Sequence, residues 1–177
     1  GDDLWIGTRR GLSRFRNGEF SNYGALDGLS QSTVFAIFED REGSIWVGPK
    51  NGLNQFVDSE TVFYTTSDGL PSNNMGPVLE DKNGTLWGGT LGGGLFSYIN
   101  GTFHTFGQRD GLGSDTVIAL VEQPGTGTDS VLWVGTKNGL NRFRNGRLEA
   151  TFTQQHGLPR AVPVVLASQP PARQPLS

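Results

Sequence analysis

Short apolar stretches alternate with turn residues along the chain. Between residues 33 and 65 these stretches are Val34 to Glu39, Ser44 to Gly48, Leu53 to Val57 and Thr61 to Thr65. The segments between them, such as Asp40 to Gly43, are rich in Asp, Asn, Ser and Gly, which favour tight hairpin turns. No stretch has the 3.6-residue period of an amphipathic helix. The pattern therefore predicts four short antiparallel strands in this unit.

The same unit occurs four times. The segments DLWIGTRRGL, SIWVGPKNGL, TLWGGTLGGGL and VLWVGTKNGL begin at residues 3, 44, 85 and 131. They contain all the tryptophans of the chain, Trp5, Trp46, Trp87 and Trp133. A second marker follows each tryptophan by 22 or 23 residues, Asp-Gly-Leu in three copies and His-Gly-Leu in the last. A period of about 42 residues with four strands per unit predicts an all-β fold, a β-propeller of four-stranded antiparallel blades.

About four blades are expected over residues 1–168. Their units lie near residues 1–23 together with 161–168, 33–65, 74–106 and 115–152. The first unit has only three strands, and Ala161 to Ala167 is a candidate for its missing inner strand. The four blades then close a ring alone, belong to a larger propeller, or combine with a second chain in an eight-bladed homodimer. The remaining residues, 169–177, are predicted to form a disordered, Pro-rich tail.

The strand contents predict sheets that are covered on both faces. In Ile45-Trp46-Val47-Gly48 the residues of both faces are apolar, which a sheet with one wet face does not require. We expect each Trp to pack on the next blade, where it would bury about 150–250 Å². The Gly two residues later is expected to leave room for an aromatic ring. The tryptophans are therefore interpreted as structural residues rather than as a ligand platform.

Innermost strands are expected to tolerate proline. Pro77 and Pro163 fall on first strands of their units. One edge of such a strand faces the central channel, so a missing N–H there costs no ladder bond.

Composition narrows the function. Gly accounts for 27 of 177 residues, about twice the usual share, as expected for many turns. The net charge of −3 and the dispersed basic residues argue against a nucleic-acid partner. The absence of Cys excludes disulfides and thiolate metal sites. The two histidines, His104 and His156, occupy unlike repeat positions, so no metal site and no cofactor is predicted.

The repeat carries a family resemblance. The pattern D-x-x-G-x-[IL]-W-[IV]-G-T-x-x-G-L-x-x-F, followed by DGL, occurs over Asp40 to Phe56, Asp81 to Phe96 and, without its first turn, Leu132 to Phe143. It resembles the two-component regulator propeller repeat over about residues 2–160. The resemblance implies a periplasmic sensor module of membrane-bound bacterial receptors, often hybrid histidine kinases, many of which respond to carbohydrates. The partner would then be a membrane-bound signalling domain of the same receptor. This segment itself contains no kinase residues, although a full-length parent could carry kinase activity.

Blade geometry collects candidate ligand-binding residues on one rim. The DGL connections and the loops between second and third strands share this rim, and the D-x-x-G and N-G turns share the other. The first rim gathers cationic and amide side chains, namely Arg9, Arg10, Lys50, Asn51, Asn73, Asn74, Lys137, Asn138 and Arg160. Such donors suit a carbohydrate or another polar or anionic ligand. Alternatively, these side chains pair with Asp27, Asp68 and Asp110 on the same rim and merely stay solvated.

Three functional classes remain open. The favoured one is a non-catalytic, ligand-binding sensor module. The second is a propeller enzyme, a lyase or a glycan hydrolase, which would need a His with a Glu or paired carboxylates facing the channel. The first strands offer V-F-A-I-F, M-G-P-V-L and V-I-A-L-V, which lack such groups, so no catalytic residue is assigned. The third class is a purely structural interaction repeat.

Overall fold

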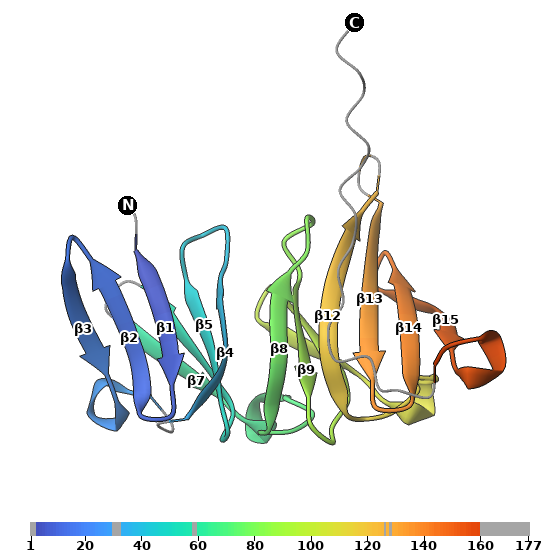
Figure 1. Ribbon diagram of the computed structural model, residues 1–177, viewed down its shortest axis with the longest axis horizontal. Helices are drawn as coiled ribbons and strands as arrows, with labels where there is room; N and C mark the ends of the chain where they lie inside the picture. The colour runs from blue at the N-terminus through green and yellow to red at the C-terminus, as the bar shows by residue number, and fades with distance from the viewer. Residues whose placement is uncertain (1–2, 30–32, 58–59, 126, 128, 160–177) are drawn as a thin grey trace, which may run out of the picture.

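The computed structural model describes residues 3–29, 33–57, 60–125, 127 and 129–159 (Figure 1). The described strands are β1 (Leu4–Thr8), β2 (Gly11–Arg16), β3 (Glu19–Tyr23), β4 (Val34–Glu39), β5 (Ile45–Pro49), β6 (Leu53–Val57), β7 (Glu60–Tyr64), β8 (Met75–Glu80), β9 (Leu86–Thr90), β10 (Leu95–Ile99), β11 (Thr102–Phe106), β12 (Val117–Pro124), β13 (Ser130–Thr136), β14 (Gly139–Arg144) and β15 (Arg147–Phe152). Four short 3-10 helices follow the sheets, η1 (Ala25–Asp27), η2 (Thr66–Asp68), η3 (Gln108–Asp110) and η4 (Gln154–His156).

The strands form four separate antiparallel sheets, as the repeat predicts. The first sheet has the order β1-β2-β3, and the others have the orders β4-β5-β6-β7, β8-β9-β10-β11 and β12-β13-β14-β15. The first strands of the second, third and fourth sheets contact each other in series, β4 with β8 and β8 with β12, so these three strands are innermost. The prediction of propeller blades with inner first strands is confirmed.

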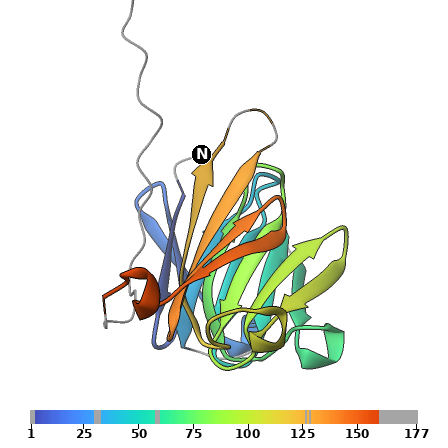
Figure 2. The same ribbon diagram turned by 90° about the vertical axis from the view of Figure 1, so that its right-hand side faces the viewer.

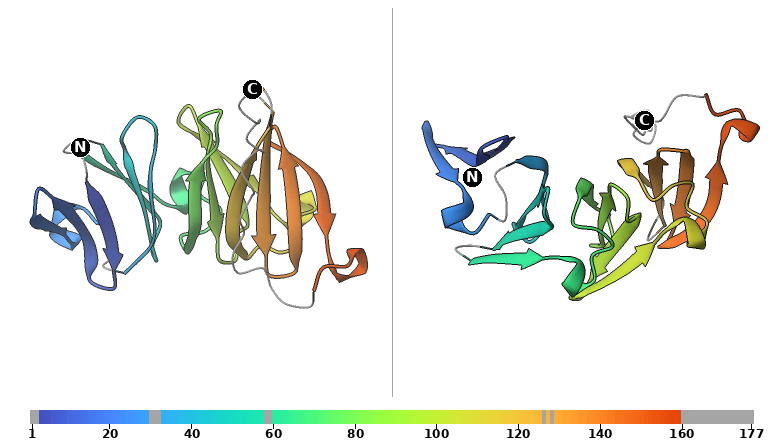
Figure 3. Two further views of the ribbon diagram at one scale, coloured as in Figure 1. Left: turned by 45° about the horizontal axis from the view of Figure 1, so that its top comes forward. Right: turned by 90° about the horizontal axis from the view of Figure 1, so that it is seen from below.

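The described sheets form an open arc. Figures 1 and 3 place the first and fourth sheets at opposite ends, with the second and third between them. The described part of the chain therefore does not close a four-bladed ring. The candidate strand Ala161 to Ala167, Pro163 and the expected tail lie outside the described residues. The other innermost proline, Pro77, lies in β8, where the register with β9 shifts between Met75 and Val78.

The aspartate of the D-x-x-G turn orients the tryptophan. Asp40 accepts hydrogen bonds from the backbone N–H of Ser44 (2.8 Å) and from the indole Nε1 of Trp46 (2.8 Å). Asp81 does the same for Thr85 (3.0 Å) and Trp87 (2.9 Å). One carboxylate thus fixes both the hairpin turn and the rotamer of the indole, and the prediction of hairpin turns is confirmed.

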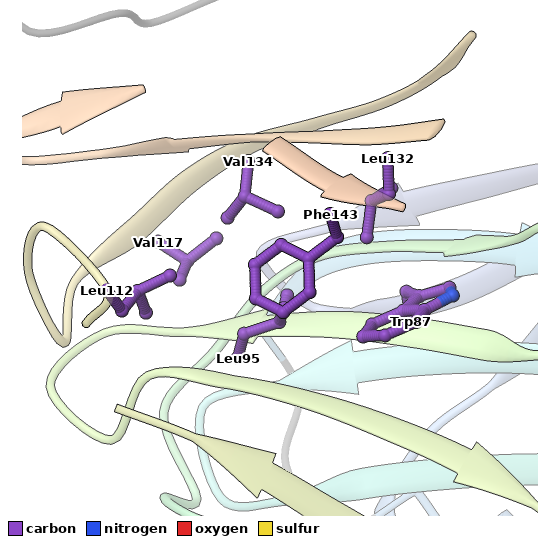
Figure 4. Packing of buried hydrophobic residues seen from close by; sticks show 7 residues of the cluster. All are labelled: Trp87, Leu95, Leu112, Val117, Leu132, Val134 and Phe143. Atoms are coloured by element: carbon purple, nitrogen blue, oxygen red, sulfur yellow. The ribbon is translucent and has the colours of Figure 1, made fainter. Parts of the chain in front are cut away.

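Each sheet packs one face on the opposite face of the next. We call the face that carries the Trp the indole face, and the face that carries the residues on either side of the Trp the opposite face. Trp87, Leu95 and Phe106 on the indole face of the third sheet meet Leu132, Val134 and Phe143 on the opposite face of the fourth. In Figure 4, Phe143 points from the fourth sheet toward Leu95 and Trp87. The same arrangement joins the first sheet to the second and the second to the third.

The tryptophans pack as expected in the two inner sheets. Trp46 and Trp87 are only 3% and 2% exposed. Their rings lie 5.5 Å from Tyr98 and 5.7 Å from Phe143, which belong to the next sheet. Trp5 and Trp133 in the end sheets are half-buried. Burial of the indoles between sheets accounts for their recurrence without any ligand.

Between the second and third sheets, the contact also includes a buried phenol pair. The hydroxyls of Tyr64 and Tyr98 lie 3.0 Å apart, and that of Tyr64 also donates to Gln55. Burial, together with this hydrogen bond, raises the pKa of Tyr64. Both hydroxyls are therefore hydrogen-bonded inside the interface.

The glycine two residues after each Trp serves a different purpose from the one predicted. A Cβ at Gly7 would lie 2.7 Å from Val34, a Cβ at Gly48 would lie 2.9 Å from Met75, and one at Gly89 would clash with Val117. These neighbours open the inner strand of the next sheet. The prediction that this glycine makes room for an aromatic ring is wrong, because the space is filled by the side chain that begins the next inner strand.

A different glycine of the third sheet, the residue directly after Trp87, does lie under a ring. Gly88 replaces the Val of Trp46-Val47 and Trp133-Val134, and a Cβ there would clash with the ring of Phe96. Where Phe96 stands, the second and fourth sheets have buried Asn54 and Asn141. Gly88 and Phe96 are therefore a matched exchange.

The segment that connects the second sheet to the third explains why Phe96 stands where the second and fourth sheets have Asn. Asn141 accepts a hydrogen bond from the N–H of Gly113, in the connection before its sheet (2.9 Å). The equivalent residue facing the third sheet is Pro71, which has no N–H to donate. An apolar ring at position 96 avoids leaving a buried amide oxygen without that donor.

A histidine replaces the recurrent aspartate at the last 3-10 turn. Asp27, Asp68 and Asp110 each accept the N–H of the residue three positions earlier, at 2.8 Å. In the last copy Nδ1 of His156 accepts the N–H of Thr153 at 3.1 Å. A carboxylate makes the stronger bond, since a charged acceptor roughly doubles the strength of such a hydrogen bond.

We expect Gly88→Val to lower the free energy of unfolding by about 1–3 kcal/mol, because the added methyls overlap Phe96. Combining it with Phe96→Asn should recover part of that loss, because removing the ring relieves the overlap, while Pro71 still denies the Asn its backbone donor. Urea unfolding of the two single variants and the double variant measures the coupling. Simple additivity of the two losses would contradict the matched exchange.

We expect His156→Asp to raise the free energy of unfolding by about 0.5–1 kcal/mol, because it restores the charged cap of the other three turns. The reverse change at an equivalent position, Asp110→His, is the matched control and should lower it by a similar amount. Thermal and urea unfolding at neutral pH test both variants. Equal free energies of unfolding for the unaltered chain and the two variants would show that the type of acceptor at this turn does not affect stability.

Candidate functional site

The loops separate into two rims as predicted. The loops β1–β2, β5–β6, β9–β10 and β13–β14 and the four 3-10 helices lie along the lower edge of the arc in Figure 1. They bring Arg9, Arg10, Lys50, Asn51, Asn73, Asn74, Lys137 and Asn138 to one rim. The last candidate, Arg160, lies outside the described residues. We call this edge the loop rim.

Backbone hydrogen bonds tie the loops of the second, third and fourth sheets to the connections between those sheets. Gly52 N donates to Asn73 O (2.7 Å) and Leu91 N donates to Asn74 O (2.9 Å), so the loops of the second and third sheets hold the connection between them. Lys137 N donates to Thr116 O (2.9 Å) in the next connection. The loops therefore present their side chains from a fixed backbone.

The candidate side chains differ in whether they form hydrogen bonds within the protein or are exposed to solvent. Asn73 accepts the N–H of Thr66 through Oδ1 (2.9 Å), and Asp115 does the same for Gln108 at the equivalent position (2.8 Å). Asn73 is therefore a structural cap of its own turn. Asn51, Asn74 and Asn138 are exposed, as are all four cationic candidates that the structure describes.

The rim aspartates do not neutralise the rim cations. Asp27, Asp68 and Asp110 are held by the backbone N–H groups of their own turns. Within the described residues, Arg9, Arg10, Lys50 and Lys137 have no carboxylate within 4.0 Å, and the ion pairs lie elsewhere. The alternative in which these cations merely pair with the three aspartates is therefore not what the structure contains. The cationic donors face solvent.

The third sheet interrupts the cationic series. Its loop has Leu91, Gly92 and Gly93 where the second and fourth sheets have Lys50-Asn51 and Lys137-Asn138. Leu91 is 49% exposed, and nothing lies within 4 Å of a Cβ placed at Gly92. The rim thus has a low, apolar gap with a lysine loop on each side.

A hollow beside the fourth sheet does not belong to this site. It has a volume of about 620 Å³ and is lined by Lys137, Asn138, Gln154 and Gln155 among others. In the two preceding sheets the same place holds the next connection, through Asn73 O on Gly52 N and Asp115 O on Gly94 N. The hollow therefore corresponds to the place where the backbone of a connecting segment packs in the preceding sheets, and we assign no ligand to it.

Sequence reasoning missed a cleft between the third and fourth sheets, near the rim that carries the D-x-x-G and N-G turns. It has a volume of about 1100 Å³, and its lining includes Ser97, His104, Phe106 and Arg147. The equivalent hollow between the second and third sheets, lined by Gln55 and Tyr98 among others, has about 300 Å³. A small side chain at position 97 widens the cleft. The signal was present in the repeats, because this position is Arg14, Gln55 and Arg142 in the other sheets.

The described part of the chain contains neither a metal-binding cluster nor a membrane-spanning helix. No three His, Asp or Glu side chains there gather closely enough to hold a metal ion. The described helices also include none with the length and hydrophobicity needed to cross a bilayer.

Known proteins share the repeat and the fold. A family model described as "Two component regulator propeller" matches residues 28–51. No curated protein matches the chain. The extracellular domain of the putative one component system BT4673 from B. thetaiotaomicron is 26% identical, with a TM-score of 0.65 over 84% of this chain and 21% of that one. A second structure, of the extracellular domain of the putative hybrid two component system BT4673, is 24% identical, with a TM-score of 0.67 over 86% and 21%.

A lyase shares the fold alone. A catalytically inactive virginiamycin B lyase from Staphylococcus aureus is 16% identical, with a TM-score of 0.58 over 85% of this chain and 52% of that one. The present chain spans about a fifth of the BT4673 domains that it resembles. The match to the two component regulator propeller model covers residues 28–51, and the four Trp-marked sheets repeat the unit to which this segment belongs.

Proposed function

We propose that this chain is a non-catalytic, ligand-sensing propeller module of a bacterial two-component signalling receptor. It would lie on the periplasmic side of the membrane, as part of the extracellular region of that receptor. Its occupancy would be passed to a membrane-bound signalling domain of the same receptor. The observation that supports this proposal most is the loop rim, whose cations stay exposed while its aspartates are held by their own turns.

The ligand that fits this rim is a polar or anionic carbohydrate. Lys50 and Lys137 flank the gap at Leu91 to Gly93, so acidic groups of a ligand can meet a lysine on each side. The apolar face of a sugar ring can lie over Leu91, and Asn51, Asn74 and Asn138 supply amide donors and acceptors for hydroxyls. This division of charged and apolar contacts suits a sulfated or uronic-acid oligosaccharide.

A binding role fits the inner strands better than an enzymatic one. The described first strands of the second to fourth sheets present Val, Phe, Ala, Ile, Leu, Met, Gly and Pro up to a Glu, which is Glu39, Glu80 or Glu122. Glu80 and Glu122 accept backbone N–H groups from the turn of the preceding sheet, Glu80 from Arg41 (2.9 Å) and Glu122 from Lys82 (3.0 Å). These carboxylates therefore join neighbouring sheets. The similarity to a lyase at 16% identity supports the fold and not its chemistry.

We expect Lys50→Ala combined with Lys137→Ala to weaken the binding of a sulfated uronic-acid disaccharide by about 5- to 30-fold. The estimate assumes that each exposed lysine contributes about 0.5–1 kcal/mol to an ion pair with the ligand. Titration calorimetry at low and high salt measures the effect, and the affinity of the unaltered chain should fall as salt rises.

The matched control is Arg147→Ala, which removes a cation from the cleft between the third and fourth sheets and should leave the affinity unchanged. Unaltered affinity in the double lysine variant would reject the loop rim as the site. A loss caused by Arg147→Ala alone would move the ligand to the cleft between the third and fourth sheets.

A further inference from the structure

The third sheet lacks a planar polar side chain that the other sheets place beside the indole. In each of the four sheets, the residue paired with the Trp on the next strand projects from the same face as the indole. These pairs are Trp5 with Arg14, Trp46 with Gln55, Trp87 with Ser97 and Trp133 with Arg142. The guanidinium of Arg14 lies over the ring of Trp5 at 5.3 Å, and that of Arg142 lies over the ring of Trp133 at 5.7 Å. The short side chain of Ser97 leaves this place beside Trp87 open.

The open place belongs to the cleft of about 1100 Å³ between the third and fourth sheets. One wall is the indole face of the third sheet, and the other includes the turn between β14 and β15. In Figure 2, which views the molecule from the side of the fourth sheet, that sheet lies in front of the third. In the preceding pair of sheets, Gln55 fills the equivalent place and is hydrogen-bonded to Tyr64 and Ser44. The larger cleft can hold a small molecule.

Three polar side chains of the cleft have no partner among the described residues. Ser97 is only 6% exposed, yet its hydroxyl forms no hydrogen bond with them. His104 is paired with Ser97 on the neighbouring strand and projects from the same face, and its ring is likewise without a hydrogen bond in this part of the chain. Arg147 has no described carboxylate within 4.0 Å. Because a buried polar group without a partner costs free energy, the hydroxyl of Ser97 indicates a place for a ligand atom.

The charges of the cleft favour an anionic ligand. Arg147 supplies a permanent positive charge with several N–H donors. The acidic residue of the lining is Asp81, whose carboxylate already accepts three N–H groups of the protein. They are the backbone N–H groups of Asn83 (2.9 Å) and Thr85 (3.0 Å) and the indole N–H of Trp87 (2.9 Å). An acid group of a ligand would therefore find Arg147 as its charged partner, with Ser97 and His104 as further donors.

The apolar part of the cleft favours a flat ligand. Trp87 and Phe106 lie on the indole face with ring centroids 5.9 Å apart, and Ile99 beside them is 39% exposed. Aromatic rings pack on such groups in offset or edge-to-face arrangements. A flat ring is also the shape closest to the guanidinium and amide groups that occupy this place in the other sheets.

We propose that this cleft is a second binding site, which takes an aromatic carboxylate. The ring of the ligand lies beside Trp87 and Phe106, where Arg14 and Arg142 place their guanidinium groups in other sheets. Its carboxylate is held by Arg147, with hydrogen bonds from Ser97 and His104. The site lies at the other rim from the proposed carbohydrate site and takes a different class of ligand, so this inference does not rest on the loop rim.

The two histidines of the chain provide the readout. His104 lines the cleft, whereas His156 caps the last 3-10 turn at the loop rim. Titration of the full chain with naphthoate should shift the NMR ring resonances of His104 and leave those of His156 in place, and His156→Asp assigns the two sets. Cyclohexanecarboxylate keeps the charge without the flat ring and should bind about 2- to 10-fold more weakly. Unshifted His104 resonances at millimolar naphthoate, or equal binding of the two acids, would overturn the proposal.

Variants of the lining locate the bound acid. Ser97→Arg restores the side chain of the first and fourth sheets and should weaken naphthoate binding by at least about tenfold, because it fills the cleft. Ser97→Ala is the matched control, which keeps the cleft open and should weaken binding by only about 2- to 5-fold through the lost hydrogen bond. If Ser97→Arg binds naphthoate as the unaltered chain does, the site is wrong.

The exposed Arg147 allows a test that does not depend on repacking the cleft. Arg147→Ala should weaken naphthoate binding by about 3- to 10-fold, because it removes the charged partner of the carboxylate. Arg109→Ala removes the same charge from η3, at the other rim of the molecule, and should leave the affinity unchanged. Equal affinities of these two variants for naphthoate would also overturn the proposal, whatever the stability of Ser97→Arg.

Discussion

The contact between one indole face and the next sheet is the interaction on which the rest of this structure depends. A single four-stranded sheet of five-residue strands cannot bury both its faces, so each sheet is stable only beside another. The aspartate of the D-x-x-G turn sets this contact, because it holds the turn and the indole N–H with the same carboxylate. The glycine two residues later lets the next inner strand approach closely, since any side chain there would meet Val34, Met75 or Val117.

Because the contacts between sheets stabilise the fold, the exposed side chains of the loop rim are available to bind a ligand. The rim aspartates close their own 3-10 turns, and the connections receive the backbone N–H groups of the loops. The side chains of Lys50 and Lys137 take no part in these contacts and remain exposed on a fixed backbone. A ligand that bridges loops of neighbouring sheets would gain from that order, because little conformational entropy of the backbone is lost on binding.

The sequence was sufficient to predict the architecture, since the Trp and DGL markers recur with nearly constant spacing and each strand has a short apolar core. The strand bounds are within about one residue of those observed for units such as β4 and β6. What could not be predicted lies between units. The role of the glycine after each Trp was misassigned, because the residue that fills its space, Met75 for Gly48, comes from a different repeat. The wide cleft at Ser97 was missed for the same reason, as both of its walls come from separate sheets.

The third sheet departs most from the repeat, and its departures are physically linked. Pro71 removes an N–H from the preceding connection, so the buried Asn of the other sheets would lose a donor, and Phe96 over Gly88 replaces it. The same sheet replaces the lysine loop by Leu91 and glycines, and it opens the outer cleft through Ser97. Positions that all copies share are explained by the architecture, so recognition has to come from positions where one copy differs. The third sheet differs most from the other copies and lies between two lysine loops. By that argument, a specific ligand would be recognised at the third sheet.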